Sequence, residues 1–310
     1  MTGSITLFLT SALPRLPLSL QLPIPLLVLI PYATTYLATT HTAHHITPAT
    51  HAHHMTAYPY DNILFRPGKT CSTCHLTKPA RSKHCSLCST CIAMADHHCP
   101  WINNCVGRGN YRYFLALLLS LGIMEAYGAY LAFYILRPHL APSKTLPLFS
   151  HGNWTTLLNA IHKGGLSIAG VGLLAASTFL LPLGLLAYHC YLIWAGMTTN
   201  ESQKWADWRD DMADGVVFKA KRSALQTHNR LRKYGDRASD ASATNPALGA
   251  DEDPYVPWPV SSDQILVSTN DGQPPAGQEG LWTRTWDLSE VDNIYDLGGW
   301  DNFMEILKGR

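Results

Sequence analysis

Residues 71–105 concentrate the thiols and imidazoles of this 310-residue chain. The segment contains seven of the eight cysteines and four of the fifteen histidines. Cysteines separated by two residues are typical of zinc sites, because a tight turn brings both thiolates to one tetrahedral ion. The candidate ligands are Cys71, Cys74, His75, His84, Cys85, Cys88, Cys91, His97, His98, Cys99 and Cys105.

Two closed four-ligand zinc sites would not use all of these side chains, so the segment holds a surplus. The surplus coincides with Asp96-His97-His98-Cys99. A carboxylate, an imidazole and a thiol in that order are the parts of an activated cysteine nucleophile. The sequence therefore predicts a zinc-built frame that holds a reactive cysteine.

This segment resembles the cysteine-rich domain of the DHHC protein S-acyltransferases, which are palmitoyltransferases. The resemblance covers residues 58–205 well and the last twenty residues more loosely. It rests on residues at fixed spacing, namely Cys71-x-x-Cys74, Lys78-Pro79-x-Arg81, His84-Cys85-x-x-Cys88-x-x-Cys91, Asp96-His97-His98-Cys99-Pro100-Trp101, Asn104-Cys105-x-Gly107 and Asn110.

The resemblance implies two interleaved structural zinc sites. By position, the first is formed by Cys71, Cys74, His84 and Cys91, and the second by Cys85, Cys88, His98 and Cys105. The resemblance also implies that Cys99 is the acyl-accepting nucleophile, that His97 is its base and that Asp96 orients that base. We expect the remaining His75 to be a solvated loop residue.

The composition indicates a membrane protein. Hydrophobic residues make up 46% of the chain and charged residues only 15%, which is less charge than an average soluble protein carries. The net charge of +1 gives no indication of a nucleic-acid partner. Because the cysteines have zinc-site spacing, we expect a reducing compartment in which they form no disulfides.

We expect an α-helical integral membrane protein with three to four transmembrane helices and a small cytosolic zinc domain. Residues 113–136 and 166–196 are apolar enough to span, and Pro182 is expected to kink the second. Residues 17–38 are long enough, but their three prolines predict a kinked helix. Residues 4–13 are too short. Since the family usually has four spans, they are either the remnant of one or the N-terminus is incomplete.

Six segments follow from this interpretation. They are an N-terminal membrane and histidine-rich part (1–57), the cysteine-rich zinc domain (58–112), a transmembrane helix (113–136), a luminal loop (137–165), a transmembrane helix (166–196) and a cytosolic tail (197–310). The orientation comes from the positive-inside rule. The loop holds three Lys or Arg, whereas residues 66–112 hold seven. Asn153 in the loop begins a glycosylation sequon.

Two side chains within the spans need an interpretation. Glu125 is either a functional carboxylate or a partner in a helix-to-helix hydrogen bond, and we favour the hydrogen bond. Cys190 is expected to pack as a small apolar residue and not to act as a second nucleophile.

Outside the zinc domain and the spans, the sequence is less informative. Residues 39–57 are rich in histidine and are interpreted as a low-complexity linker, with a metal-scavenging tract as the alternative. Residues 216–233 are basic, which suits either an anionic membrane surface or a solvated helix. Residues 234–280 are expected to be a flexible linker.

Two short motifs flank these segments. Thr198-Thr199-Asn200-Glu201 matches the TTxE motif of the family, and its spacing is also that of a helix-capping box. Residues 293–303 resemble the C-terminal motif of the family, which implies a structural role for Asn302.

The resemblance implies transfer of a palmitoyl group from palmitoyl-CoA to cysteines of membrane proteins in the bilayer. Lys69, Arg108 and Arg112 are candidates for binding the CoA phosphates. The similarity is greatest to the fungal subtype that acylates juxtamembrane cysteines of vesicle-fusion (SNARE) proteins, which implies the endoplasmic reticulum. The alternative is a zinc-dependent membrane interaction module in which Cys99 does no chemistry.

Overall fold

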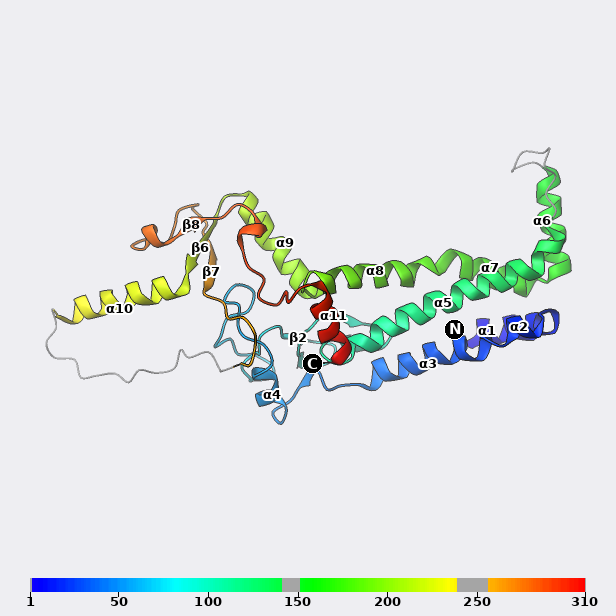
Figure 1. Cartoon of the computed structure of the whole chain (residues 1–310), viewed down its shortest axis with the longest axis horizontal. Coiled ribbons are helices and arrows are strands. Elements are labelled where there is room, and N and C mark those ends of the chain that lie inside the picture. Colours follow the sequence, from blue (N-terminus) through cyan, green and yellow to red (C-terminus); the bar gives the residue numbers. More distant parts are fainter. Residues whose placement is uncertain (1, 141–150, 239–255, 310) are drawn as a thin grey trace. The chain divides into compact units, whose positions relative to one another are not determined.

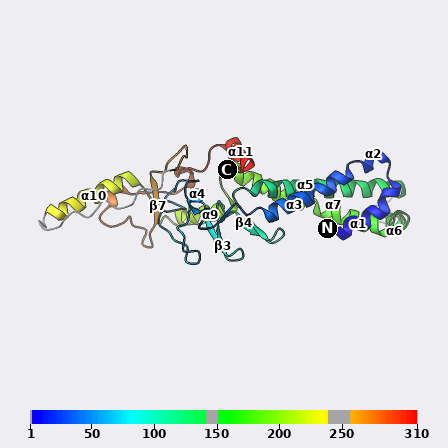
Figure 2. The ribbon, with the colours of Figure 1, turned by 90° about the horizontal axis from the view of Figure 1, so that it is seen from below.

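The computed structural model describes residues 2–140, 151–238 and 256–309. It divides into two compact units. The first, the membrane unit, comprises residues 1–40 and 112–190, and the second, the zinc unit, comprises residues 41–111 and 191–310. Figures 1 and 2 show the elements of both units in two views.

The membrane unit is helical. Three helical stretches are long and apolar enough to cross a membrane: Leu18–Thr40, Tyr111–His139 and Leu166–Trp194. Helices α3, α5 and α7 run side by side in both views (Figures 1 and 2). The helices are α1 (Thr2–Ala12), η1 (Leu13–Arg15), α2 (Leu18–Gln21), α3 (Ile24–Thr40), α5 (Tyr111–Leu136), η2 (Arg137–His139), α6 (His151–Gly164), α7 (Leu166–Thr178) and α8 (Leu180–Trp194). This architecture confirms the predicted α-helical membrane protein.

Prolines explain where these helices are interrupted. Pro23 separates α2 from α3, and Pro31 lies inside α3. In the last span the break falls at Phe179, between α7 and α8. Pro182 has no N–H to donate to the carbonyl of Thr178 four residues earlier, so the hydrogen-bond ladder cannot continue there. The last span is therefore interrupted a few residues upstream of Pro182, near the predicted kink.

Helix α1 packs against α7, although α1 is too short to span, as predicted. Phe8 and Ala12 of α1 and Ile168 of α7 belong to one buried apolar cluster. The Ser167 hydroxyl donates to the Ser11 hydroxyl over 3.0 Å. Glu125 of α5 lies near Thr178 of α7. The Thr178 hydroxyl donates to the carbonyl of Leu174 in its own helix, and Oε2 of Glu125 is buried without a hydrogen-bond partner among the described residues. The helix-to-helix hydrogen bond of Glu125 therefore stays a prediction.

The segment 137–165 contains η2 and α6 on either side of residues 141–150, which lie outside the described residues. Asn153 of the predicted sequon falls within α6, but its side chain is also outside the described part. The predicted glycosylation therefore stays a prediction.

Among the described residues, the zinc unit combines three small antiparallel sheets with four α-helices and two 3-10 helices. The strand orders are β1-β3-β2, β4-β5 and β7-β6-β8. The strands are β1 (His45–Ile46), β2 (Lys83–Cys85), β3 (Thr90–Ile92), β4 (His97–Cys99), β5 (Asn104–Val106), β6 (Val217–Lys221), β7 (Gln264–Ser268) and β8 (Thr283–Arg284). The helices are α4 (His51–Met55), α9 (Thr199–Ala213), α10 (Arg222–Ala238), η3 (Glu279–Leu281), η4 (Leu288–Glu290) and α11 (Gly299–Lys308).

The histidine-rich segment 39–57 is folded, so its prediction as a low-complexity linker is wrong. His45 and Ile46 form β1, which pairs with β3, and His51–Met55 form α4. Strand pairing and burial of Ile46 hold the segment in place despite its composition. Among the described residues, no histidine of this segment belongs to a group of metal-type ligands. The metal-scavenging alternative has no support either.

The tail also contains more regular structure than predicted. The basic segment 216–233 begins as β6, whose Val217 is buried with Leu266 of β7 and with Trp205 and Met212 of α9. Strand β7 lies in the segment predicted as a flexible linker, so that prediction is wrong for residues 256–280. Residues 239–255 lie outside the described residues. The error arose because the β6–β7 core joins apolar residues from distant positions, which local composition does not reveal.

Candidate active site

The first cysteine–histidine cluster is the one that the family resemblance implied. Cys71, Cys74, His84 and Cys91 have their ligand atoms within 4.8 Å of one another. The distances from His84 Nδ1 to the sulfurs of Cys71, Cys74 and Cys91 are 3.5, 3.4 and 3.9 Å. A tetrahedral zinc with bonds of about 2.3 Å to sulfur and about 2.0 Å to nitrogen separates its ligand atoms by about 3.6 Å. The cluster therefore fits a zinc ion.

The second cluster consists of Cys85, Cys88, His98 and Cys105, again as predicted. His98 Nδ1 lies 3.6, 3.4 and 3.7 Å from the sulfurs of Cys85, Cys88 and Cys105. The sulfurs of Cys88 and Cys105 are 3.7 Å apart. Three thiols and one imidazole at these separations also match a closed structural zinc site.

Strand geometry explains how the two clusters interleave. Successive side chains of a strand point to opposite faces. On β2, His84 therefore enters the first cluster and Cys85 the second. On β4, His98 enters the second cluster opposite Cys105, its partner on β5. His97 and Cys99, the two residues beside His98, must then share the other face of the hairpin.

Cys99 lies outside both clusters and is hydrogen-bonded to His97. Burial of the Cys99 side chain disfavours its thiolate. The hydrogen bond with His97 and nearby backbone N–H groups outweigh burial, so the pKa of Cys99 is lowered. Burial also disfavours the charged form of His97, which by itself would lower the pKa of His97. Hydrogen bonds with Asp96 and Cys99 outweigh burial and raise the pKa of His97 to about 9. The contacts between Cys99, His97 and Asp96 thus favour transfer of the thiol proton to His97.

Asp96 is held in place by donors from three directions. Its Oδ2 lies 2.6 Å from Nδ1 of His97 and accepts a hydrogen bond from the Thr199 hydroxyl over 3.0 Å. Its Oδ1 accepts from the Thr199 N–H over 2.7 Å and from the Tyr111 hydroxyl over 3.3 Å. Because Nδ1 of His97 is engaged by the carboxylate, the other ring nitrogen remains for Cys99.

The TTxE motif forms a helix cap, which confirms that interpretation of it, and it also contacts the site. Thr198 and Glu201 form a capping box at the start of α9. The Thr198 hydroxyl also donates to the carbonyl of Ala95, next to Asp96. The cap therefore fixes the first turn of α9, from which Thr199 reaches the Asp96 carboxylate.

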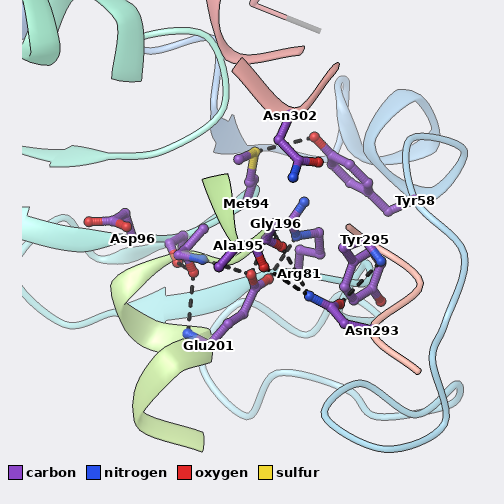
Figure 3. A network of polar contacts seen from close by, with 12 residues as sticks. Tyr58, Arg81, Met94, Asp96, Ala195, Gly196, Glu201, Asn293, Tyr295 and Asn302 are labelled. Carbon is purple, nitrogen blue, oxygen red and sulfur yellow. Dashed lines mark hydrogen bonds and ion pairs between the residues drawn. The ribbon is translucent and has the colours of Figure 1, made fainter. Parts of the chain in front are cut away.

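A buried ion pair anchors this cap (Figure 3). Arg81 donates through Nε and Nη2 to the two carboxylate oxygens of Glu201, each over 2.7 Å, and both side chains are 2% exposed. The guanidinium lies 5.1 Å from the Tyr58 ring centre and 4.7 Å from that of Tyr295. The sequence places Arg81 in a motif of the family but does not indicate which residue pairs with it. A buried arginine requires a carboxylate, but which one was not predictable.

The C-terminal segment packs on the same network (Figure 3). The Asn302 amide donates to the carbonyl of Trp194 and to the Asp296 carboxylate, and its oxygen accepts from the Leu297 N–H. Asn302 is 3% exposed. The predicted structural role of Asn302 thus agrees with its contacts. Tyr58 adds a hydrogen bond of 2.6 Å to Glu305 of α11.

The three cations expected to bind the CoA phosphates differ in the residues that they contact. Lys69 is exposed. Arg108 lies 3.5 Å from a ring nitrogen of His53 and 5.8 Å from the centre of the Tyr58 ring. Arg112 stacks on Tyr113 and donates to its hydroxyl. His75 is exposed at a positive φ of 55°, as a loop residue should be.

Comparison with known proteins identifies the family. A family model described as DHHC palmitoyltransferase matches residues 65–206. The chain is 44% identical, over 97% of its length, to a protein of Aspergillus fumigatus named palmitoyltransferase swf1, 82% of which is covered. The chain belongs to the DHHC palmitoyltransferase family.

Two further fungal relatives support this family assignment. The palmitoyltransferase swf1 of Emericella nidulans is 41% identical over 97% of this chain and 75% of the relative. The palmitoyltransferase SWF1 of Neurospora crassa is 38% identical over 90% of this chain and 66% of the relative. This DHHC protein is thus an integral membrane S-acyltransferase of the fungal Swf1 type.

Proposed function

We propose that Cys99 of this palmitoyltransferase carries the acyl group, that His97 is its general base and that Asp96 orients His97. One observation carries the proposal. The two zinc-type clusters use all the other cysteines of residues 71–105 and leave Cys99 on the opposite face of β4, hydrogen-bonded to His97. A thiol, an imidazole and a carboxylate in series form an activated nucleophile.

The transfer would occur in two steps of thioester exchange. In the first, His97 takes the Cys99 proton, the sulfur attacks the thioester carbonyl of palmitoyl-CoA, and CoA leaves as a thiol with the proton from His97. In the second, a substrate cysteine gives its proton to His97 and attacks the acyl-Cys99 thioester, and Cys99 leaves as the protonated thiol. The energy of the thioester is kept throughout, so no further reactant is needed.

The two clusters would each hold one structural Zn²⁺, with Cys71, Cys74, His84 and Cys91 in one site and Cys85, Cys88, His98 and Cys105 in the other. Each cluster supplies a complete set of four protein ligands, which leaves no open coordination position for substrate. Bound zinc would supply rigidity to the β4–β5 hairpin. The residues of the chain itself would carry out the proton transfers.

The acyl donor and the membrane setting complete the proposal. Lys69, Arg108 and Arg112 would contact the CoA phosphates. The positive-inside rule supports a cytosolic zinc unit. The resemblance of the sequence to the fungal subtype supports SNARE-type membrane proteins with juxtamembrane cysteines as the substrates, in the endoplasmic reticulum. No observation favours the alternative of an inactive interaction module.

A reconstituted transfer assay tests the substrate class. The enzyme is placed in liposomes with palmitoyl-CoA and a synthetic single-span peptide that carries one cysteine at the cytosolic end of its helix. We expect palmitoylation of this peptide and much slower reaction with a peptide whose cysteine lies about twenty residues beyond the helix, because the acyl chain remains in the bilayer. Equal rates for both peptides would contradict the juxtamembrane preference.

A further inference from the structure

The histidine-rich segment contacts the strand that pairs with the proposed nucleophile. Cys99 on β4 lies opposite Asn104 on β5. The Oδ1 of Asn104 is 3.0 Å from Nε2 of His45, and its Nδ2 donates to the backbone carbonyl of His41 over 3.1 Å. Asn104 is 3% exposed. Both the oxygen and the nitrogen of the Asn104 side-chain amide therefore form hydrogen bonds with one short segment, residues 41–46.

The same segment is fixed to the first cluster. Strand β1 pairs His45 with Ile92 and Ile46 with Cys91, which is a ligand of that cluster. The Ala93 N–H donates to the carbonyl of His44 over 2.8 Å, and the Thr90 hydroxyl donates to that of Ile46 over 3.0 Å. Residues 41–46 thus connect the sheet of the first cluster to the hairpin of the second.

The packing around this connection leaves little room for movement. His44 is fully buried, and Ile46 is 2% exposed. At Gly107, just after β5, an added Cβ would lie 2.8 Å from the carbonyl oxygen of Ala93 and 3.4 Å from the ring of His44. Only glycine therefore fits at position 107, where the chain leaves the β4–β5 hairpin. His44 of the histidine-rich segment is one of the residues that limit this space.

We propose that His45 is a positioning residue for the reaction, which acts through Asn104 to hold the β4–β5 hairpin and thereby the Cys99 sulfur. The segment 41–46 lies outside residues 65–206, which match the family model. Since a carboxamide oxygen only accepts, His45 donates through Nε2–H. Zinc ions would hold each cluster internally, whereas this segment fixes one cluster relative to the other. The inference rests on the proposed role of Cys99.

The test measures acyl-enzyme formation by single turnover with palmitoyl-CoA in the full-length enzyme, together with zinc content and the rate of Cys99 alkylation. His45→Phe keeps a ring in β1 but has no donor, whereas His45→Gln keeps a donor at similar reach. We expect His45→Phe to acylate about tenfold more slowly with unchanged zinc, because a nucleophile displaced by a fraction of an ångström reacts poorly. The acylation rate of His45→Gln should lie within about threefold of the wild-type rate.

His75, which is exposed in a loop and has no proposed role, provides the matched control, and His75→Gln should acylate at the wild-type rate. Acylation of His45→Phe at the wild-type rate would overturn the proposal. So would equal slowing of the Phe and Gln variants with loss of zinc, which would make His45 a support of the zinc frame alone. If His45→Phe does not accumulate, His45→Ala replaces it. Absence of any acyl-enzyme in the wild type would instead refute the role of Cys99.

Discussion

Asp96→Asn should reduce acyl-enzyme formation by about a thousandfold or more while the protein stays folded and retains its zinc. The asparagine oxygen can still accept from the Thr199 N–H, as Oδ1 of Asp96 does. Its amide nitrogen then faces Nδ1 of His97, where the carboxylate oxygen now lies at 2.6 Å. Two N–H groups cannot face each other, so His97 must move its proton to the nitrogen that serves Cys99. In that tautomer the ring cannot accept the thiol proton.

The measurement is the single-turnover rate of Cys99 acylation at saturating palmitoyl-CoA. Thr199→Val is the companion variant, because it removes the hydroxyl donor to Asp96 but keeps the Thr199 N–H. It should slow acylation far less than Asp96→Asn. If Asp96→Asn acylates within about threefold of the wild type, the orienting role of Asp96 is wrong.

Arg81→Met should destabilise the zinc unit by about 3–5 kcal/mol, since it leaves the Glu201 carboxylate buried without its counter-ion. Both side chains are 2% exposed and share two hydrogen bonds of 2.7 Å. Glu201 also accepts from the Thr198 N–H at the start of α9. Loss of the ion pair should therefore also disturb the first turn of α9 and weaken the contacts of Thr199 with Asp96. Acylation should become slower as a result.

A double-mutant cycle separates the ion pair from simple packing. Arg81→Met, Glu201→Gln and the double variant are compared by their thermal midpoints in detergent. The double variant should be more stable than the sum of the single losses predicts, because the uncompensated charge is gone. Arg209→Met, an exposed cation on the same helix, is the control and should stay close to the wild type. Additive losses would show that Arg81 and Glu201 do not act as a pair.

The spacing of the thiols and imidazoles predicted zinc sites and a reactive cysteine, and the family resemblance implied which residue belongs to which cluster. Both ligand clusters and the Asp96-His97-Cys99 series lie within residues 71–105, where turns and short strands set the geometry locally. The membrane spans were predictable because a run of about twenty apolar residues indicates a transmembrane helix. In both cases the interactions that matter join residues close in sequence.

Contacts between distant residues could not be predicted in this way. Arg81 and Glu201 are 120 positions apart, and His45 and Asn104 are 59 apart. The pairing of β6 with β7 likewise joins two segments that composition described as a basic surface and a linker. The low complexity of residues 39–57 gave no indication of a strand, because β1 is defined by its partner β3 and not by an apolar pattern of its own.

Trapping the acyl-enzyme tests the role of Cys99 most directly. The purified enzyme and its Cys99→Ser variant are incubated with an alkynyl palmitoyl-CoA, and the zinc content of both is measured. We predict a label on the wild type that neutral hydroxylamine removes, and no label on the variant with its zinc retained. Equal labelling of the variant would contradict the account and direct attention to Cys190. No label on a zinc-replete wild type would also contradict it and favour a non-catalytic module.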